Sequence, residues 1–515
     1  MSSESRCEKK SYEEMKSLIM LDSRIMALGQ LLYTATHKYA NNTALSWRDR
    51  SMTYHELYSR VQHFAQKISQ HGIQPGDRVL LFFENSFEFY IGYHAIAQLG
   101  AVVAPLNTFL RERELAHIID DCKAKMLIAS KELLSRLKED HITNLPVVLT
   151  EDDMMLHESI PLAHIVKPPA HLQPDEMAAL LYTSGTTGLP KGVMLSSRNI
   201  FVNVVQGIAP LGLTSQERAL GVLPLFHSFA QTTCVWGSML LGCSVIVVPK
   251  IERRHIQEGL QLEPTVILGV PALFGLLCLM RNASFGSVKY FISGGDALPD
   301  RIRAAFELIY NRKLCSGYGL SETSPALTAD MDDESAPTNT VGKPLVGVLL
   351  SIRDEKNSEV SQGEIGLIWA SGEQIMLGYY NAPEKTAQVI VDGWFNTGDL
   401  GYIDEYGKLV ITGREKDIIV NKGFKIYPQE IENIISSHPL VIRVGVIGVE
   451  DEAAGQVPVA YVQIRQMQDG IEKQLRELCV HNLASYKVPR HFICTTDNLP
   501  TTATGKVDKK RLGKN

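Results

Sequence analysis

Small, hydroxylated and flexible residues run together with a lysine in one stretch of the sequence. The stretch reads Tyr182-Thr183-Ser184-Gly185-Thr186-Thr187-Gly188-Leu189-Pro190-Lys191-Gly192. Glycines let backbone N–H groups approach a ligand closely, and hydroxyls with the compact charge of Lys191 suit phosphate oxygens. A P-loop would need Gly-Lys followed by Ser or Thr, whereas Gly192 follows Lys191 here. The stretch therefore predicts a polyphosphate-binding loop of another kind, and its length disfavours the alternative of an ordinary flexible loop.

Six further motifs follow this stretch along the chain. They are Pro224-Leu225-Phe226-His227, Ser293-Gly294-Gly295-Asp296, Gly317-Tyr318-Gly319-Leu320-Ser321-Glu322-Thr323, Trp394-Phe395-Asn396-Thr397-Gly398-Asp399, Gly413-Arg414-Glu415-Lys416-Asp417 and Thr504-Gly505-Lys506. In this order they make the sequence similar to the adenylate-forming superfamily of acyl-CoA synthetases, peptide-synthetase adenylation domains and beetle luciferases. The resemblance extends from about Ala27 to the C-terminus. One such motif could arise by chance, whereas six in order could not.

The resemblance implies a binding site for ATP. The residues implied to bind it are Thr183, Ser184, Gly185, Thr186, Thr187, Gly188, Lys191, Gly294, Gly295, Asp296, Gly317, Tyr318, Gly319, Ser321, Glu322, Asp399, Arg414 and Lys506. Tyr318 would offer its aromatic face to adenine, against the backbone of Gly294 to Asp296. Asp399 would accept both ribose hydroxyls, because a carboxylate has two acceptor oxygens, and Arg414 would be its partner.

The resemblance also implies metal-binding and catalytic residues. Glu322 and Thr183 would bind Mg²⁺, which takes oxygen ligands. Lys506, in a Pro-x-x-x-x-Gly-Lys context, would place its ammonium between the carboxylate and the α-phosphate and stabilise charge on the attacking and bridging oxygens. Lys191 would act with it, and His227 would line the acyl pocket near the carboxylate.

Without the neighbouring motifs, several of these residues have plainer interpretations. Tyr318 would be a core tyrosine and Asp399 a turn residue after a glycine. Lys506 would be a solvated lysine of a basic tail, and His227 a packed core histidine. The motif order favours the functional interpretation in each case.

The implied reaction has two halves. The acid attacks the α-phosphate of MgATP to give an acyl-adenylate and pyrophosphate, and a thiol then displaces AMP. Coenzyme A is the favoured thiol, because the chain ends soon after Lys506 with no fused carrier domain. A fatty acyl-AMP ligase that loads a carrier protein is one alternative. A catalytically silent nucleotide-binding protein is a remote one, which the joint presence of Lys191, Glu322, Asp399, Arg414 and Lys506 disfavours.

The acid is predicted to be a medium- or long-chain fatty acid. The strings Gly378-Tyr379-Tyr380 and Gly423-Phe424-Lys425-Ile426-Tyr427-Pro428 are most similar to those of fatty acid CoA ligases. Aryl ligases of the 4-coumarate type are the second alternative. Amino-acid-activating relatives carry an aspartate near the His227 position, and this sequence does not. Where bacterial long-chain enzymes have a tryptophan gate the sequence reads Ser228-Phe229-Ala230-Gln231, so the length of the acyl tail stays open.

Alternating strand and helix patterns surround these motifs. The first unit has a strand at residues 78–84, a Ser86 cap before a helix, and Gly100 before a strand at residues 101–104. Further strands are predicted at residues 219–223, 243–248, 266–268 and 288–292, with helical stretches after His227 and at residues 271–280 and 299–310. This alternation predicts mainly parallel sheets covered by helices on both faces.

The pattern changes after about Lys343, where short strands and glycine-rich turns predict a small β subdomain. Helices at residues 428–437 and 471–483 and strands at residues 443–448 and 457–464 then predict a separate unit. The predicted fold is α/β, with a large N-terminal domain of parallel-rich sheets covered by helices plus a small β subdomain, and a small mobile α+β C-terminal domain. The predicted boundaries are an N-terminal extension (1–26), an adenylation core (27–413), a hinge linker (414–416) pivoting at Lys416, and the mobile domain (417–515).

Length, composition and charge indicate which broad class of protein this is. The chain has 515 residues, of which 45% are hydrophobic and 21% charged, and this predicts a soluble globular protein of at least two domains. A net charge of −6 gives no general attraction to nucleic acid. No transmembrane segment and no secretory signal is found, and eight scattered cysteines are predicted to be reduced, so a cytoplasmic protein is expected. Peripheral membrane contact and the oligomeric state, a homodimer included, stay open.

Overall fold

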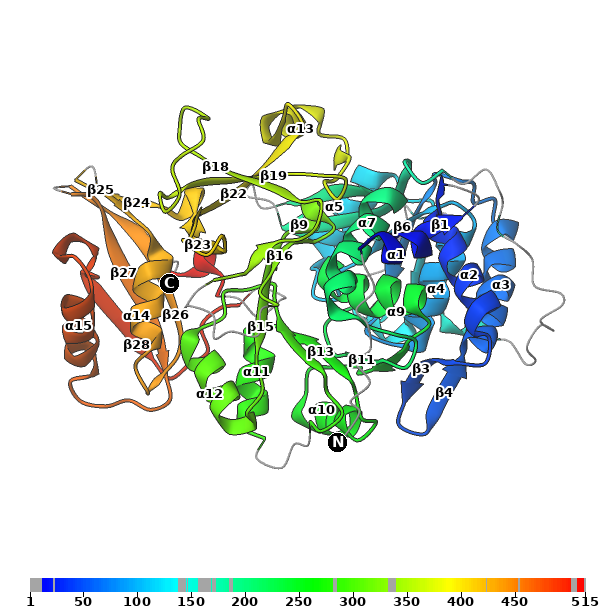
Figure 1. Ribbon diagram of the computed structural model, residues 1–515, viewed down its shortest axis with the longest axis horizontal. Coiled ribbons are helices and arrows are strands. Elements are labelled where there is room, and N and C mark those ends of the chain that lie inside the picture. The colour runs from blue at the N-terminus through cyan, green and yellow to red at the C-terminus, as the bar shows by residue number, and fades with distance from the viewer. Residues whose placement is uncertain are drawn as a thin grey trace, which may run out of the picture.

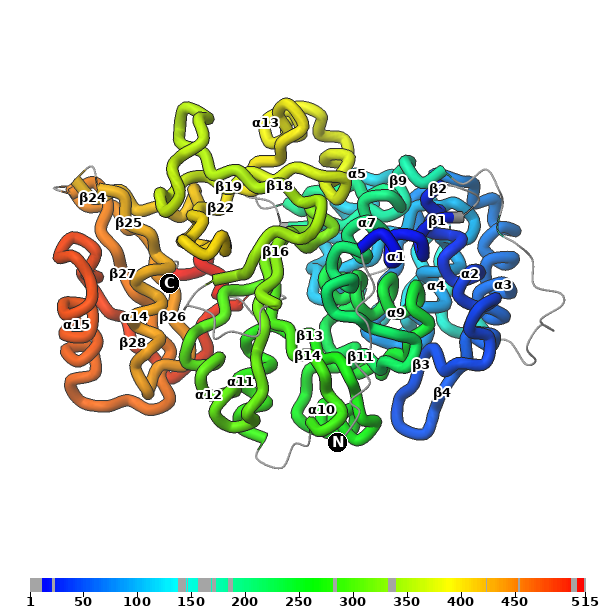
Figure 2. Tube along the Cα trace, viewed as in Figure 1, coloured from blue at the N-terminus to red at the C-terminus, as the bar shows by residue number. Residues whose placement is uncertain are grey.

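The structure is a computed structural model that describes most of the chain. The described residues are 12–21, 24–137, 145, 147–155, 168, 173–184 (Ser184 by its backbone alone), 189–280, 285–331, 340–422, 424–452, 454–501 and 507–513. Figure 1 shows an elongated molecule in which the N-terminal part, blue to green, forms a large body and the C-terminal part, orange to red, forms a separate lobe. A smaller group of strands, yellow-green to yellow, lies along one side (Figure 2).

The first large sheet contains the predicted phosphate-binding segment. Its seven strands lie in the order β20-β10-β9-β6-β5-β7-β8. They are β5 (Arg78–Phe82), β6 (Val102–Pro105), β7 (Met126–Ala129), β8 (Val148–Leu149), β9 (Met177–Ser184), β10 (Pro190–Ser196) and β20 (Gly378–Tyr379). Strands β5, β6 and β7 are parallel and almost wholly buried, as expected of strands covered on both faces.

Helix α4 (Phe87–Gln98) connects β5 to β6 and confirms the first predicted unit. The Ser86 hydroxyl accepts a hydrogen bond from the Phe89 amide at 3.1 Å. This bond satisfies one of the free amides of the first helical turn and begins the helix at the expected residue. Gly100 has a φ of +73°, a left-handed conformation that glycine adopts without strain after a helix ends.

The second large sheet has nine strands in the order β17-β16-β15-β14-β13-β11-β12-β3-β4. They are β3 (Thr43–Trp47), β4 (Arg50–Thr53), β11 (Arg218–Gly221), β12 (Ser244–Val247), β13 (Val266–Gly269), β14 (Tyr290–Ser293), β15 (Cys315–Gly319), β16 (Ala326–Ala329) and β17 (Lys343–Pro344). The strands from β15 to β3 are all parallel. Helices of this part include α3 (Tyr54–Gln70), α7 (Ser197–Ile208), α10 (Arg253–Leu260), α11 (Pro271–Cys278) and α12 (Asp300–Tyr310). The predicted parallel-rich α/β domain is confirmed.

The helical stretch predicted after His227 is irregular. Helix α8 (Ser228–Ala230) passes into a π-helix, η7 (Gln231–Gly237), and then into α9 (Ser238–Leu241). Two tyrosines of α4 bond to it, since Tyr90 Oη donates to the Cys234 carbonyl and Tyr93 Oη donates to Gln231 Oε1, both at 3.1 Å. Single π-turns often occur at functional sites, and hydrophobic periodicity over so short a stretch does not reveal them.

The small sheet confirms the predicted change of pattern after Lys343. Its strands are β18 (Leu349–Arg353), β19 (Gly366–Ser371), β21 (Ile390–Val391), β22 (Trp394–Ile403) and β23 (Leu409–Arg414), with α13 (Pro383–Val389) between them in sequence. Strand β23 pairs with β22, which is also the neighbour of β19 and β21.

The C-terminal lobe has its own sheet and its own apolar core. It contains β24 (Ile419–Asn421), β25 (Phe424–Ile426), α14 (Pro428–Ser436), β26 (Val441–Asp451), β27 (Gly455–Ile464), α15 (Ile471–Asn482) and β28 (His491–Thr495). Buried Ile431, Ile435 and Leu475 belong to this core. Arg301 of α12 reaches across from the large domain and donates to the Val441 carbonyl at 2.6 Å.

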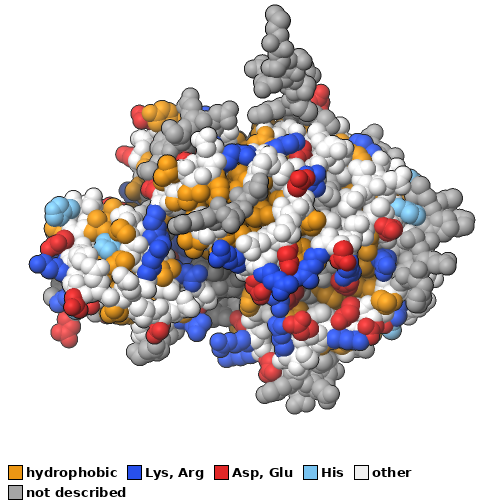
Figure 3. Space-filling model, turned by 90° about the horizontal axis from the view of Figure 1, so that it is seen from below, with side chains coloured by type: hydrophobic (Ala, Val, Ile, Leu, Met, Phe, Trp, Pro, Cys, Tyr) orange, Lys and Arg blue, Asp and Glu red, His pale blue; other side chains and the backbone are white. Residues whose placement is uncertain are grey.

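The first described residues pack into the large domain. Met15, in helix α1 (Tyr12–Lys16), and Ile19 are almost wholly buried in the same core as α4. On the face seen in Figure 3, acidic and basic side chains are interspersed over the large domain. None of the helices that the structure describes is long and apolar enough to span a bilayer.

Candidate active site

Strands β9 and β10 form a hairpin that carries the first predicted site residues. Thr183 lies opposite Lys191, and Ser184 lies opposite Pro190. Directly opposed residues project to the same face of a sheet, so the side chains of Thr183 and Lys191 lie on one face. Gly185, Thr186, Thr187 and Gly188 connect the two strands and lie outside the described residues.

Lys191, Glu322 and Tyr379 meet beside this hairpin. Lys191 Nζ lies 3.1 Å from Glu322 Oε1 and 2.6 Å from Tyr379 Oη. The Tyr379 hydroxyl in turn donates to Glu322 Oε1 at 2.9 Å. Glu322 lies in the short helix η8 (Ser321–Thr323) after β15 and is only 7% exposed, so these partners replace most of the water around its carboxylate.

Tyr379 was not predicted as a site residue. It reaches the site because β20 pairs with β10, with Tyr379 opposite Val193. The only local signal is Gly378 before it, which has a φ of +140°. Burial and the neighbouring Glu322 raise the pKa of Tyr379, so its hydroxyl stays protonated and donates to the carboxylate.

Thr183 and Glu322 fit a magnesium ion that arrives with a nucleotide. Thr183 Oγ1 is buried and has no hydrogen-bond partner among the described residues, an arrangement that a ligand or water normally relieves. Mg²⁺ is commonly held by one or two protein side chains together with phosphates and water. The described residues contain no cluster of three or more acidic, His or Cys side chains that could form a protein-only cage. Thr183 and Glu322 would therefore supply the protein oxygens.

A second group of predicted residues meets at Asp399. Tyr318 Oη, from β15, donates to Asp399 Oδ2 at 2.7 Å. Arg414 lies opposite Asp399 in the β22–β23 pair, and its Nε is 3.0 Å from Asp399 Oδ1. A carboxylate has two acceptor oxygens, as two ribose hydroxyls would require.

The electrostatics of this group follow from the buried carboxylate. Asp399 is 4% exposed. It raises the pKa of Arg414 above the usual value for a guanidinium. Burial, followed by the charge of Asp399, raises the pKa of Tyr318. The phenol is therefore a fixed hydrogen-bond donor to the carboxylate.

Gly294, Gly295 and Asp296 follow β14 at the edge of the sheet where β15 presents Tyr318. The two strands are parallel neighbours, with Ser293 opposite Ser316. A Cβ on Gly294 would lie 3.0 Å from the Phe229 ring, so this backbone passes directly over an aromatic side chain. Asp296 is exposed, and its Oδ1 accepts a hydrogen bond from the Ala297 amide.

Gly317 and Gly319 are required by close packing of β15 against the next segment. A Cβ on Gly319 would lie 1.9 Å from the Pro325 carbonyl oxygen, and one on Gly317 would lie 3.0 Å from the Thr328 carbonyl oxygen. Any larger residue at position 319 would displace the strand that carries Tyr318.

His227 directly precedes helix α8. Its Nδ1 accepts a hydrogen bond from the Phe229 amide at 3.3 Å and caps the helix. The next residue, Ser228, has its Oγ 3.2 Å from Ser321 Oγ. The structure thus brings the residue after His227 next to Ser321, which is predicted to bind ATP.

Lys506 lies outside the described residues, but the chain on both sides of it is described. Thr501 and Val507 form an antiparallel bridge around residues 502–506. Burial, followed by the charge of Arg414, lowers the pKa of Lys416 just after β23, and Lys510 acts in the same direction. Figure 1 shows this C-terminal segment, in red, facing β23.

Residues 32–380 match the family model described as AMP-binding enzyme, and residues 430–506 match the AMP-binding enzyme C-terminal domain. The chain belongs to the AMP-binding enzyme family. It is 30% identical to a long-chain-fatty-acid–CoA ligase of Bacillus subtilis (strain 168), over 94% of each chain. It is 33% identical to a 2-succinylbenzoate–CoA ligase of Geobacillus kaustophilus (strain HTA426), over 91% of this chain and 94% of the relative.

A solved relative has the same fold. The o-succinylbenzoate coenzyme A synthetase of Bacillus subtilis, in complex with ATP and a magnesium ion, superposes with a TM-score of 0.85. It is 27% identical, and the match covers 94% of this chain and 98% of that one. The predicted α/β fold and the predicted resemblance are both confirmed.

This AMP-binding enzyme is an acid–CoA ligase that works through an adenylate. Adenylate-forming ligases use ATP, Mg²⁺ and coenzyme A, which confirms the predicted cofactors. The relatives divide between fatty acids and 2-succinylbenzoate, so family membership alone does not select the acid.

Proposed function

We propose that this enzyme activates a medium- or long-chain fatty acid as its acyl-adenylate and transfers it to coenzyme A. The observation that carries this proposal is the helical segment after His227. Residues 228–241 contain no charged side chain. Val235, Trp236 and Met239 in this segment are fully buried in the largest apolar core. An acid whose carboxylate lies beside His227 would therefore direct its tail toward uncharged surroundings.

The same observation disfavours acids with a second charge. An ammonium or a distal carboxylate beside this segment would lose its hydration and find no charged partner within residues 228–241. Amino acids and dicarboxylates are thus poorer candidates than fatty acids, whose tails favour apolar surroundings.

The first half-reaction follows from the two residue groups. Tyr318, Asp399 and Arg414 would hold the nucleoside, and Lys191 and Glu322 would bind at the phosphates. Positioning and charge neutralisation account for most of the catalysis in phosphoryl-group chemistry. Lys506 would then complete the site when the carboxylate oxygen attacks the α-phosphate and pyrophosphate leaves.

The second half-reaction would use another face of the C-terminal lobe. After rotation about Lys416, the region of Lys422 to Lys425 would replace Lys506 at the site. Phe424, 56% exposed, stacks on Tyr486 with ring centroids 4.9 Å apart. Such a surface could receive the thiol substrate, whose sulfur attacks the acyl carbonyl while AMP leaves.

A substrate panel tests the proposal. Saturated acids from acetate to stearate, cinnamate, 4-coumarate, 2-succinylbenzoate and free amino acids would be assayed for thioester formation with ATP and coenzyme A. We expect kcat/KM to be highest for a medium- or long-chain fatty acid. Robust ATP–pyrophosphate exchange with an amino acid would contradict the proposal that the acid beside His227 lies in uncharged surroundings.

Lys506→Ala tests the assignment of the two halves. It should reduce adenylate formation by about 100- to 1000-fold, because one preorganised charge donor is lost. Thioester formation from supplied acyl-adenylate should be largely retained. Equal losses in both halves would contradict the role given to Lys506.

2-Succinylbenzoate is the second candidate substrate. Relatives named 2-succinylbenzoate–CoA ligase align with nearly the whole chain, and this similarity favours 2-succinylbenzoate. A kcat/KM for 2-succinylbenzoate above that for every fatty acid in the panel would replace the fatty-acid proposal with this one. An aryl acid in first place would instead favour the 4-coumarate type.

A further inference from the structure

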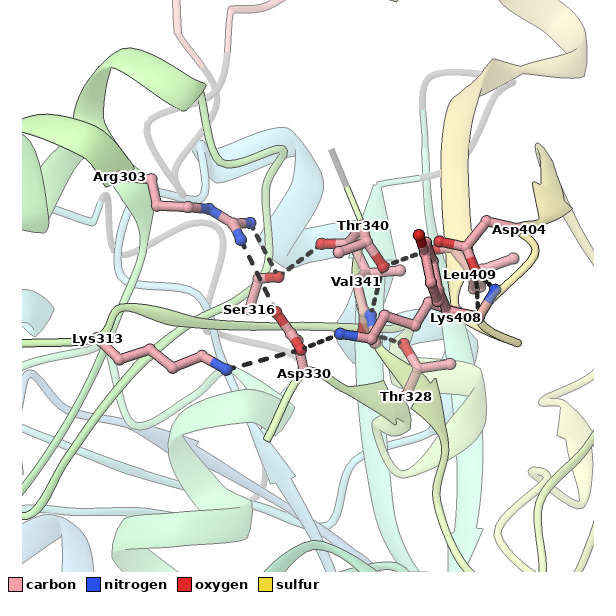
Figure 4. Close-up of polar contacts among 12 residues, drawn as sticks. Arg303, Lys313, Ser316, Thr328, Asp330, Thr340, Val341, Asp404, Lys408 and Leu409 are labelled. Carbon is pink, nitrogen blue, oxygen red and sulfur yellow. Dashed lines mark hydrogen bonds and ion pairs between the residues drawn. The ribbon is translucent and has the colours of Figure 1, made fainter. Parts of the chain in front are cut away.

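A buried carboxylate surrounded by cations lies between the nine-stranded sheet and the small sheet (Figure 4). The Asp330 side chain has no exposed surface, and its Oδ1 lies 3.2 Å from Lys408 Nζ and 3.9 Å from Lys313 Nζ. Arg303 Nη1, from α12, lies 3.8 Å from Oδ2. Lys408 is itself only 5% exposed. Removing Lys408 takes away the nearest of three cations from a carboxylate with no exposed surface, and removing Asp330 takes the shared anion from all three, so the cluster holds its neighbours in one arrangement.

Two hydroxyls connect this cluster to the neighbouring strands. Ser316 Oγ accepts from Arg303 Nη2 at 3.3 Å and donates to the Thr340 carbonyl at 2.8 Å. Thr340 Oγ1 donates to the Leu409 carbonyl at 3.2 Å. We refer to Asp330, Lys408, Arg303, Ser316 and Thr340 as the Asp330 network.

The network joins the beginnings of two strands. Ser316 lies at the start of β15, and the Asp330 amide bonds to its carbonyl at 2.7 Å. Lys408 directly precedes β23, which begins at Leu409. Figure 4 shows Lys408 and Asp330 reaching toward each other from these two parts of the chain.

The same two strands carry nucleotide-site residues farther along. Ser316 and Tyr318 are two residues apart on β15, so their side chains project to one face of the strand. β23 ends at Arg414. Tyr318 and Arg414 both bond to Asp399, at 2.7 and 3.0 Å. β15 and β23 are therefore joined twice, once through the Asp330 network and once through Asp399.

We propose that Asp330 and Lys408 are positioning residues for the nucleotide. They fix β23 against β15, so that Asp399 and Arg414 lie in register with Tyr318. Lys408 acts through β23, without contact with the nucleotide. The inference rests on the nucleotide role of Asp399 in the proposed function and adds a determinant that no motif of the sequence contains.

The test is ATP binding by the full-length protein, measured by titration calorimetry, with thermal unfolding recorded for each variant. Lys408→Met keeps the side-chain length and removes the charge. Small displacements of positioned groups can cost about 100-fold in reaction rate. We expect a smaller effect on binding, with the Kd for ATP rising about tenfold. Lys408→Arg keeps the charge and should restore the Kd to within about twofold.

Lys67→Met is the matched control. Lys67 Nζ bonds to Asp153 at 2.7 Å and joins α3 to the short helix η4 (Glu151–Met154), neither of which carries a predicted site residue. This variant should bind ATP as the wild type does, even where its melting temperature falls. Thr340→Val, which removes the bond to Leu409 without changing a charge, should weaken ATP binding severalfold.

A folded Lys408→Met variant with the wild-type Kd overturns the inference, as does an equal change of Kd in Lys67→Met at the same loss of stability. If Lys408→Met does not fold, Thr340→Val decides by the same criterion. Asp399→Asn separates this inference from the proposed function. Normal ATP binding in Asp399→Asn would contradict both the nucleotide role of Asp399 and the positioning role of Lys408. Weak binding in Asp399→Asn together with normal binding in Lys408→Met would contradict the positioning role alone.

Discussion

Asp399 and Arg414 face each other across the β22–β23 pair, and the guanidinium reaches the buried carboxylate at 3.0 Å. Arg414→Leu removes a charge-assisted bond from a side chain that is itself about half exposed. We therefore expect a loss of about 1 to 2 kcal/mol in the free energy of unfolding. The Kd for ATP should also rise about tenfold, which corresponds to a loss of about 1.4 kcal/mol in the free energy of binding.

Denaturant unfolding and calorimetric ATP titration measure the two effects of Arg414→Leu. Arg353→Leu is the control, because Arg353 lies in the same small sheet and packs over Trp369 and Trp394. An unchanged Kd in Arg414→Leu, or an equal change in Arg353→Leu, would remove Arg414 from the nucleotide site.

Tyr379→Phe removes a single hydroxyl that bonds to both Glu322 and Lys191. The ring stays packed, so folding should be retained. The carboxylate loses one donor, and we expect kcat/KM for MgATP to fall about tenfold, with more Mg²⁺ needed for half-maximal activity. Tyr380→Phe, at the adjacent residue, should leave the Mg²⁺ dependence unchanged. The same Mg²⁺ dependence in Tyr379→Phe and the wild type would show that Tyr379 plays no part at the phosphates.

Lys416→Pro tests the predicted hinge. Lys416 lies in a short helix, η9 (Glu415–Asp417), immediately after β23. Proline holds φ at about −65° and restricts Glu415 as well, so it should trap one arrangement of the two domains. We expect adenylate formation to survive within about tenfold while thioester formation falls far more. In single-turnover assays, with Lys416→Ala as the control, equal reduction of both halves would place the pivot elsewhere.

His94 predicts how stability depends on pH. It is 3% exposed, and burial lowers its pKa to about 3. An unfolded histidine takes up a proton near pH 6.5, so between the two values the unfolded state binds more protons. The free energy of unfolding should fall as the pH is lowered below 6.5, by about 2 kcal/mol at pH 5 from this residue.

Unfolding of wild type and His94→Leu, compared at several pH values, isolates this contribution. Above pH 7 the difference between the two proteins should be constant. Below pH 6.5 the wild type should lose stability faster than the variant. Parallel curves for wild type and His94→Leu would mean that His94 has the same pKa in the folded and the unfolded protein.

Local signals predicted the elements well. Ser86 and Gly100 mark where α4 begins and where the chain turns after it, because capping and left-handed backbone are properties of single residues. The strand and helix ranges of the large domain follow from short apolar runs between such signals. The π-helix η7 was not predicted, because hydrophobic periodicity over so short a stretch does not distinguish a widened turn from an α-helix.

The motifs that resemble a known superfamily predicted residues that the structure brings together, but they did not include every residue in contact with them. Tyr318, Asp399 and Arg414 do meet, although hydrophobic periodicity alone would not have joined them. Tyr379 depends on the pairing of two strands remote in sequence, and Asp330 and Lys408 depend on the packing of two sheets. Long-range pairings of this kind leave no pattern in the local sequence.

In the nine-stranded sheet, strands that are synthesised early pair with a strand that is synthesised much later. β3 and β4 are made early, yet β3 pairs with β12 through Leu45 and Val245. At about 5 to 20 residues per second, the ribosome needs roughly 10 to 40 seconds to make the intervening segment. During that interval the nascent chain carries a hairpin whose neighbouring strand in the sheet has not yet been made. The β3 edge that pairs with β12 therefore stays without its partner strand until the chain has been made through β12.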